Sequence, residues 1–143
     1  MGKKRIATKA GGTEKTAQTA AARLARKKLD SGILFIEATY NNTKLALSNT
    51  DGGVVTWSSS GSLGFKGAKK GTPFAAAKVG EMLGERAKQL GLRDVHVVVT
   101  GVGSGRESAI RSFVGKSGAT ISSIQDRTPV PFNGPRAKKP RRV

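Results

Sequence analysis

Residues 33–58, which read ILFIEATYNNTKLALSNTDGGVVTWS, contain three short apolar stretches separated by two groups of turn residues. Asn41-Asn42-Thr43 and Asp51-Gly52-Gly53 are typical of tight turns, because asparagine and glycine accept the positive φ angles that such turns use. The stretches are rich in aliphatic and aromatic side chains, and the middle one alternates between apolar and polar residues. We therefore predict an antiparallel meander of three strands, at residues 33–40, 44–49 and 54–58.

A long helix is predicted after the meander. Thr72-Pro73 supplies a helix cap and a first helical residue, and the helix should end near Leu90, before Gly91. Gly80 and Gly84 lie on one row of this helix and cost roughly 1 kcal/mol each relative to alanine. Such a cost indicates close approach of the helix to the sheet or to a partner. The face expected to be buried carries Ala75, Val79, Met82, Leu83 and Leu90.

Strand and helix patterns then alternate. Residues 94–100 are a near-continuous apolar run, which predicts a strand covered on both faces. The glycine-rich residues 101–105 lead into a helix predicted over residues 106–116, where Ser104 and Glu107 match a capping box. A last strand is predicted over residues 119–125.

The order is therefore strand, strand, strand, helix, strand, helix, strand. Strands joined through a helix pair in parallel, so the predicted fold class is α/β, with one domain built on a mixed sheet. The organisation expected is a basic N-terminal extension (residues 1–29), a core domain (30–126) and a basic, proline-rich C-terminal tail (127–143).

Charge is concentrated at the two ends. The chain has 143 residues and a net charge of +17. Residues 1–29 hold nine Lys or Arg and one acidic residue, and residues 127–143 hold six and none. Such segments bury too little apolar surface to fold alone, and they are typical of tails that become ordered on a polyanion such as RNA or DNA.

Composition excludes several classes of function. The chain has no Cys and one His, which rules out disulfide scaffolds, thiolate chemistry and multi-histidine metal sites. No apolar run is long enough to span a membrane. The N-terminal segment has too few large aliphatic side chains for an import helix, and neither end has the apolar residues of a membrane-surface anchor.

Two glycine-rich loops are candidates for phosphate binding. Residues 59–71 place Phe65 among Lys66, Lys69 and Lys70, where lysines could neutralise phosphates and Phe65 could stack on an unpaired base. The alternative is a solvated loop with Phe65 packed on the core. Residues 101–105 lack the glycine spacing of a dinucleotide loop. Their N–H groups, together with Arg106, suit an RNA phosphate, although a simple tight turn explains the glycines as well.

No catalytic site is predicted. A two-metal nuclease would need clustered carboxylates, but Asp51 falls in a turn, and Asp94 and Asp126 fall at opposite ends of their strands. Glu37 is the remaining candidate carboxylate. His96 lies within an apolar strand and is interpreted as a packed or sheet-face histidine.

The tail contains four prolines and is expected to be extended, as suits a chain lying in an RNA groove. Within it, Asn133 precedes Gly134, which hinders succinimide closure little. We therefore predict isoaspartate formation at Asn133.

These motifs together resemble the bacterial-type family of small-subunit ribosomal protein eleven, over residues 31–143 in unbroken order. The resemblance rests on four stretches: Tyr40-Asn41-Asn42-Thr43, Gly64-Phe65-Lys66-Gly67 with Gly71-Thr72-Pro73-Phe74-Ala75-Ala76, Gly101 to Ser108, and Asp126 to Gly134 with the Arg-Arg-Val end. The chain departs from the family at three positions. Val102 replaces the usual Pro, Phe132 replaces the usual His, and Pro135 replaces the usual Cys.

The resemblance implies a ribonuclease-H-like fold without catalysis, seated on the platform of the small subunit near the mRNA exit path and Shine–Dalgarno region. It implies small-subunit rRNA as the main partner, small-subunit proteins seven, eighteen and twenty-one as neighbours, and no cofactor. Carried onto this sequence, the family's RNA contacts fall on Asn41, Asn42, Lys66, Lys69, Lys70, Gly103, Ser104, Gly105, Arg106, Asn133, Arg136, Lys138, Lys139, Arg141 and Arg142.

The sequence therefore favours a structural rRNA-binding protein of cytoplasmic ribosomes, with organellar ribosomes as the weaker alternative. Two rival functions remain open from the residues alone: a ribonuclease-H-like nuclease and a general nucleic-acid-compacting protein.

Overall fold

The three N-terminal strands form the meander that their turn residues predict. The computed structural model describes residues 28–142. The strands β1 (Ser31–Ala38), β2 (Thr43–Ser48) and β3 (Val54–Ser59) pair antiparallel in order. Strand β1 ends two residues earlier than predicted, because Thr39 and Tyr40 belong to the turn, where Thr39 N donates to Asn42 O (2.9 Å).

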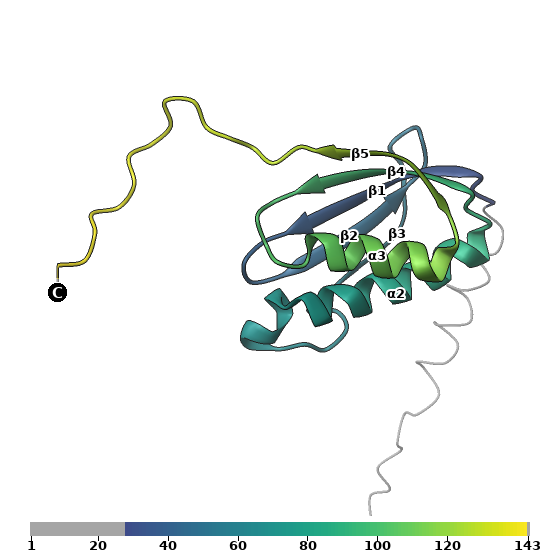
Figure 1. Ribbon diagram of the computed structural model, residues 1–143, viewed down its shortest axis with the longest axis horizontal. Coiled ribbons are helices and arrows are strands. Elements are labelled where there is room, and N and C mark those ends of the chain that lie inside the picture. Colours follow the sequence, from purple (N-terminus) through teal and green to yellow (C-terminus); the bar gives the residue numbers. More distant parts are fainter. Residues whose placement is uncertain (1–27, 143) are drawn as a thin grey trace, which may run out of the picture.

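The second half of the chain adds two parallel strands to the other edge of β1. Strand β4 (Asp94–Thr100) pairs with β1, and β5 (Thr120–Asp126) pairs with β4, which gives the sheet order β3-β2-β1-β4-β5. The predicted mixed sheet and element order are thus confirmed (Figure 1). One element was not predicted, the short 3-10 helix η1 (Gly67–Gly71) in the lysine-containing loop.

Helix α2 (Pro73–Leu90) begins and ends as its local chemistry predicts. Thr72 Oγ1 accepts a bond from Ala75 N (3.3 Å), Pro73 occupies the first turn, and Gly91 closes the helix with φ +79°. Helix α3 (Arg106–Ser117) begins as predicted, but the capping box is wrong. Ser104 Oγ donates instead to Gly71 O (3.1 Å), and Gly105 occupies the cap position without a side-chain bond.

The two helices pack against each other unusually closely. A β-carbon on Gly80 would lie 2.6 Å from Ala109 O, and one on Gly84 would lie 2.7 Å from Phe113 O. The predicted close approach is therefore made to α3, rather than to the sheet or to another molecule.

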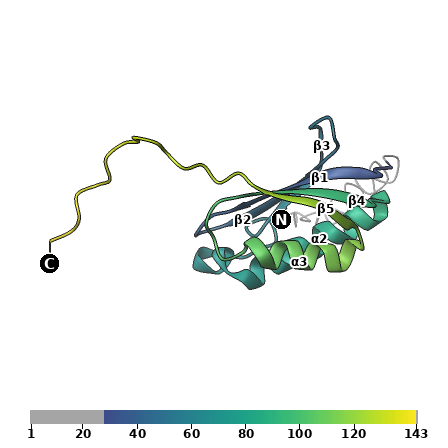
Figure 2. The same cartoon turned by 45° about the horizontal axis from the view of Figure 1, so that its top comes forward.

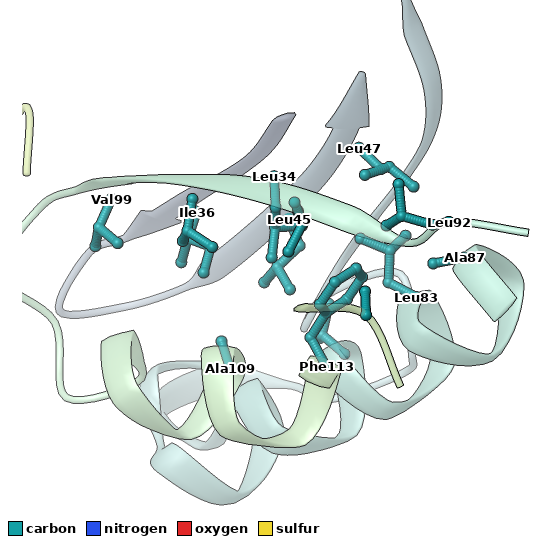
Figure 3. Close-up of a cluster of buried hydrophobic side chains, with 14 of the residues drawn as sticks. Leu34, Ile36, Leu45, Leu47, Leu83, Ala87, Leu92, Val99, Ala109 and Phe113 are labelled. Atoms are coloured by element: carbon teal, nitrogen blue, oxygen red, sulfur yellow. The ribbon is translucent and has the colours of Figure 1, made fainter. Parts of the chain in front are cut away.

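Both helices lie on one face of the sheet (Figures 1 and 2). Leucine and isoleucine side chains of β1 and β2 meet Leu83 of α2 and Phe113 of α3 in a continuous core (Figure 3). Burying a side chain of this size contributes about 1.5–3 kcal/mol. Leu29 also packs on this core, immediately before β1.

Within residues 28–142, helices cover only one face of the sheet, so the predicted cover of β4 on both faces is not found in this part of the chain. Val98, on the opposite face, is buried at the centre of the sheet by neighbouring side chains, whereas Phe35 and Trp57 are exposed. His96 lies half-buried on the same face, beside Ser123. We call this surface the open face; it carries Phe35, Glu37, Lys44, Ala46, Val54, Trp57, His96, Val98 and Thr100.

Over residues 28–142, none of the helices combines the length and apolar character that a membrane crossing requires.

Candidate nucleic-acid interface

Three loops that the sequence marks for nucleic-acid binding meet at one end of the sheet, where β1, β4 and β5 end (Figure 1). Gly103 N donates to Ala38 O (2.8 Å), which joins the β4–α3 turn to the end of β1. Ser104 Oγ donates to Gly71 O, which joins the same turn to the end of η1. We call this region the loop end; it comprises residues 39–42, 66–71, 101–106 and 126–128.

Glycines allow these segments to touch through their backbones. A β-carbon on Gly71 would collide with Tyr40 O, and one on Gly103 would collide with Thr39 O. Both positions therefore exclude a side chain, because the opposing atoms are backbone and cannot rotate away. The glycines of residues 101–105 thus have a packing role, which the tight-turn interpretation anticipated.

The β1–β2 turn presents two asparagines. Asn41 is exposed, and Asn42 is half-buried, with its N–H bonded to Thr39 Oγ1 (3.1 Å). The side-chain oxygens Asn42 Oδ1 and Thr43 Oγ1 are buried and have no partner within residues 28–142. Because both atoms are buried, an external donor does not reach them in this structure, and the polar group that this turn exposes is the side chain of Asn41.

The glycine-rich loop of residues 59–71, which we call the lysine loop, offers positive charge that residues 28–142 do not neutralise. Lys66 and Lys69 are exposed, Lys70 is half-buried, and none of the three forms an ion pair with the described residues. Phe65 packs edge-to-face on Phe74, with ring centroids 6.1 Å apart. Phe65 is therefore held against a surface ring, since Phe74 is itself 64% exposed, and it is not among the residues that pack on the core.

Arg106 is bonded within the protein. Its guanidinium donates to Gly101 O (2.6 Å) and to Asp126 Oδ2, which lies at the end of the neighbouring strand β5. The sequence does not predict this pairing and suggests an RNA phosphate as the partner of Arg106 instead. Recognising it requires knowing that β5 ends beside the β4–α3 turn.

Asp126 also fixes the first residues of the tail. Thr128 donates to Asp126 Oδ1 through both its N–H (2.9 Å) and its hydroxyl (2.6 Å). These bonds, together with the Arg106 guanidinium, hold the pKa of Asp126 well below its usual range. The negative charge of Asp126 is thus maintained at the point where the chain leaves the sheet.

Beyond Thr128 the described tail is exposed and free of helix or strand (Figures 1 and 2). Asn133 has φ +51° and turns the chain before Gly134. The basic residues of this part of the tail are all exposed: Arg136, Lys138, Lys139, Arg141 and Arg142. The predicted N-terminal extension falls almost entirely on residues 1–27, which lie outside the described part of the chain.

The carboxylates considered for metal binding do not meet. Asp94 begins β4 and Asp126 ends β5, and Glu37 pairs with Lys44 on the open face (3.3 Å). Within residues 28–142, no three His, Cys, Asp or Glu side chains lie close enough together to hold a metal ion.

Comparison with known proteins covers the folded domain and nearly all of the tail. Residues 32–142 match the sequence model of the family described as ribosomal protein S11. The small ribosomal subunit protein uS11 of Treponema pallidum (strain Nichols) is 50% identical over 118 residues, which cover 82% of this chain and 93% of the relative. The proteins of the same name from Acaryochloris marina (strain MBIC 11017) and Rippkaea orientalis (strain PCC 8801 / RF-1) are each 49% identical, covering 82% of this chain and 90% of the relative.

Proposed function

The chain belongs to the ribosomal protein S11 family and is a protein of the small ribosomal subunit, and from this premise we propose that it binds small-subunit rRNA through the loop end and the tail. Members of the family are structural proteins of the ribosome, not enzymes. The observation that carries the proposal is the meeting of three candidate loops and the tail origin at one end of the sheet.

Binding begins with electrostatic attraction. The tail holds six basic and no acidic residues, and the lysine loop adds three exposed or half-buried ammonium groups at the loop end. The phosphates of RNA release counterions when such groups neutralise them, so the free energy of binding depends strongly on salt. The extended tail then lies along the RNA, while the folded body keeps its shape.

Specificity comes from contacts that duplex DNA does not offer. The exposed side-chain amide of Asn41 can form a hydrogen bond with a ribose 2′-hydroxyl. The proposed direct contacts are Asn41, Asn42, Lys66, Lys69, Lys70, Ser104, Asn133, Arg136, Lys138, Lys139, Arg141 and Arg142. For the buried Gly103 and Gly105 we propose a packing role, because they leave room for the neighbouring segments of the loop end. For Arg106 we propose an indirect role, because its guanidinium is held by Gly101 and Asp126 and fixes where the tail begins.

The wider setting follows from the motifs shared with the family. The proposed location is the platform of the cytoplasmic small subunit, near the mRNA exit path and the Shine–Dalgarno region. The proposed neighbours are small-subunit proteins seven, eighteen and twenty-one. The N-terminal extension, with its nine basic residues, is proposed to contact rRNA as well.

Sucrose-gradient fractionation of cell extract at low and high salt tests the proposal. The chain should sediment with the small subunit at low salt. Purified protein should also bind small-subunit rRNA more tightly than random duplex DNA of equal length. Equal affinity for the two nucleic acids would contradict specific rRNA recognition and favour a compacting role.

A further inference from the structure

We propose that the open face binds an apolar segment of a neighbouring protein in the small subunit. The inference goes beyond rRNA binding by the loop end and rests on the chain's place in that subunit. It starts from a groove of about 420 Å³ on this face, lined mainly by Phe35, Ala46, Val54 and Trp57.

The pairing of the strands shapes the groove. Phe35 lies opposite Ala46, and Ala46 lies opposite Trp57, so the three residues form a row across β1, β2 and β3. Adjacent strands are about 4.8 Å apart, which places the two aromatic residues about 10 Å apart with only a methyl group between them. The groove thus has aromatic sides and a small apolar floor, a shape that accepts an inserted side chain.

The groove is apolar where a solvent-facing sheet is normally polar. Trp57 is 63% exposed and Val54 is 60% exposed, although both have the size and character of core residues. Contiguous apolar surface of this kind marks interaction sites, and aromatic residues dominate the binding energy of protein interfaces. Helices α2 and α3 lie on the other side of the sheet, so neither of them can cover it (Figure 2).

The charge of the residues that line the groove indicates a protein, rather than RNA, as the molecule that binds there. Among the groove's lining residues, the charged ones are Glu37 and Lys44, which neutralise each other at 3.3 Å. A base stacked on Trp57 would bring its phosphates over lining residues that include no uncompensated cation. Cations without an ion pair among the described residues lie at the loop end and in the tail, and also at Lys28, Arg86, Lys88, Arg93 and Arg111, but none of them lines the groove. A neutral apolar groove is complementary to an uncharged apolar segment of a protein.

Site-specific photo-crosslinking in assembled subunits tests the proposal with the full chain. One protein carries Trp57→p-benzoylphenylalanine, and a matched control carries Phe74→p-benzoylphenylalanine, because Phe74 is 64% exposed but lies beside the lysine loop. After irradiation of purified small subunits, position 57 should give an adduct with another protein, and position 74 an adduct with rRNA. Val54→p-benzoylphenylalanine provides a second attachment point in the groove and should capture the same protein.

Each other outcome is decisive. An rRNA adduct from positions 54 and 57, an adduct with the chain's own residues 1–27 or with a second copy, or no adduct at all would overturn the groove proposal. An rRNA adduct at position 74 in the same experiment would leave the proposed rRNA binding intact. Absence of the protein from small subunits would overturn both.

Discussion

Asp126 connects the folded body to the tail, because one carboxylate holds both Arg106 and Thr128. Its pKa is lowered in the folded protein by the bonds from Thr128 and then by Arg106. A lowered pKa means that the ionised form stabilises the fold. This contribution is complete above about pH 5 and is lost as the pH falls below about 4, the ordinary pKa of aspartate.

We therefore expect Asp126→Asn to lower the thermal midpoint at pH 7 and to lower it less at pH 3. Thermal unfolding at the two pH values measures the difference. Glu37→Gln is the matched control, since Glu37 is similarly exposed and pairs with a single lysine. A deficit of Asp126→Asn that is the same at both pH values would show that the carboxylate charge is not responsible.

Asn133 is the second residue with a chemical consequence. It is exposed, has φ +51° and precedes Gly134, whose amide nitrogen can attack the Asn133 side-chain carbonyl and release ammonia. Water then opens the succinimide to isoaspartate or aspartate. Peptide mapping after incubation at neutral pH should find isoaspartate at Asn133 and none at Asn41 or Asn42, whose following residues are larger. A map with no isoaspartate at Asn133 would refute the prediction.

At the residue scale, the sequence predicts the residues at helix ends better than it predicts side-chain hydrogen bonds between distant parts of the chain. Thr72, Pro73 and Gly91 act within their own helix, so local chemistry was sufficient to predict them. Ser104 was predicted to cap α3, but its hydroxyl bonds to Gly71, which the fold brings close from far away in the sequence. The pairing of Arg106 with Asp126 was missed for the same reason.

At the scale of elements, the contact between α2 and α3 depends on glycine. Gly84→Ala would place a methyl group 2.7 Å from Phe113 O. Forced packing of this kind costs about 1–3 kcal/mol, which outweighs the gain of about 1 kcal/mol in helix propensity. Urea unfolding should therefore show a less stable protein.

Gly115→Ala in α3 is the control for that experiment. Among the described residues, no atom beyond its own helical turn lies within 4 Å of a β-carbon at this position, so only the helix propensity changes. The substitution should stabilise the protein by about 0.5–1 kcal/mol. If Gly84→Ala stabilised the protein by a similar amount, the close helix contact would not be a constraint on the sequence.

The sequence also predicted the elements but not how they are layered. Turn chemistry and periodicity are local, and they located all five strands within two residues. The continuous valine run of β4 suggested cover on both faces, yet Val98 is buried by neighbouring side chains on the face that α2 and α3 leave open. Which face the helices choose is a property of their packing, and no local pattern reports it.

At the scale of the whole molecule, the concentration of positive charge at the two ends of the chain predicts how rRNA binding responds to salt. If about 6–10 phosphates are neutralised, the logarithm of the rRNA association constant should fall against the logarithm of salt concentration with a slope of about −5 to −9. Filter binding of full-length protein across a salt series measures the slope. An affinity that did not change with salt would contradict electrostatic docking.

Two variants distinguish the contribution of the tail from that of the body in that measurement. Arg141→Gln combined with Arg142→Gln should reduce the magnitude of the slope by about 2, one for each phosphate that is no longer neutralised. Lys44→Gln removes a cation that is paired with Glu37 on the open face, and it should leave the slope unchanged. If Lys44→Gln reduced the magnitude of the slope by about 1, half the effect of the double variant, net charge alone would drive binding.

The central position of β1 in the sheet also affects how the protein folds. The backbone groups on one edge of β1 pair early, in the hairpin with β2. Those on the other edge remain unpaired until β4 adds to the sheet, where Ser31 pairs with Asp94. Pairing between such distant segments forms slowly, because the intervening chain must first be brought together. A newly made molecule therefore passes through a period with a bare apolar strand edge, when aggregation competes with folding, and the pace of docking β4 sets how long that period lasts.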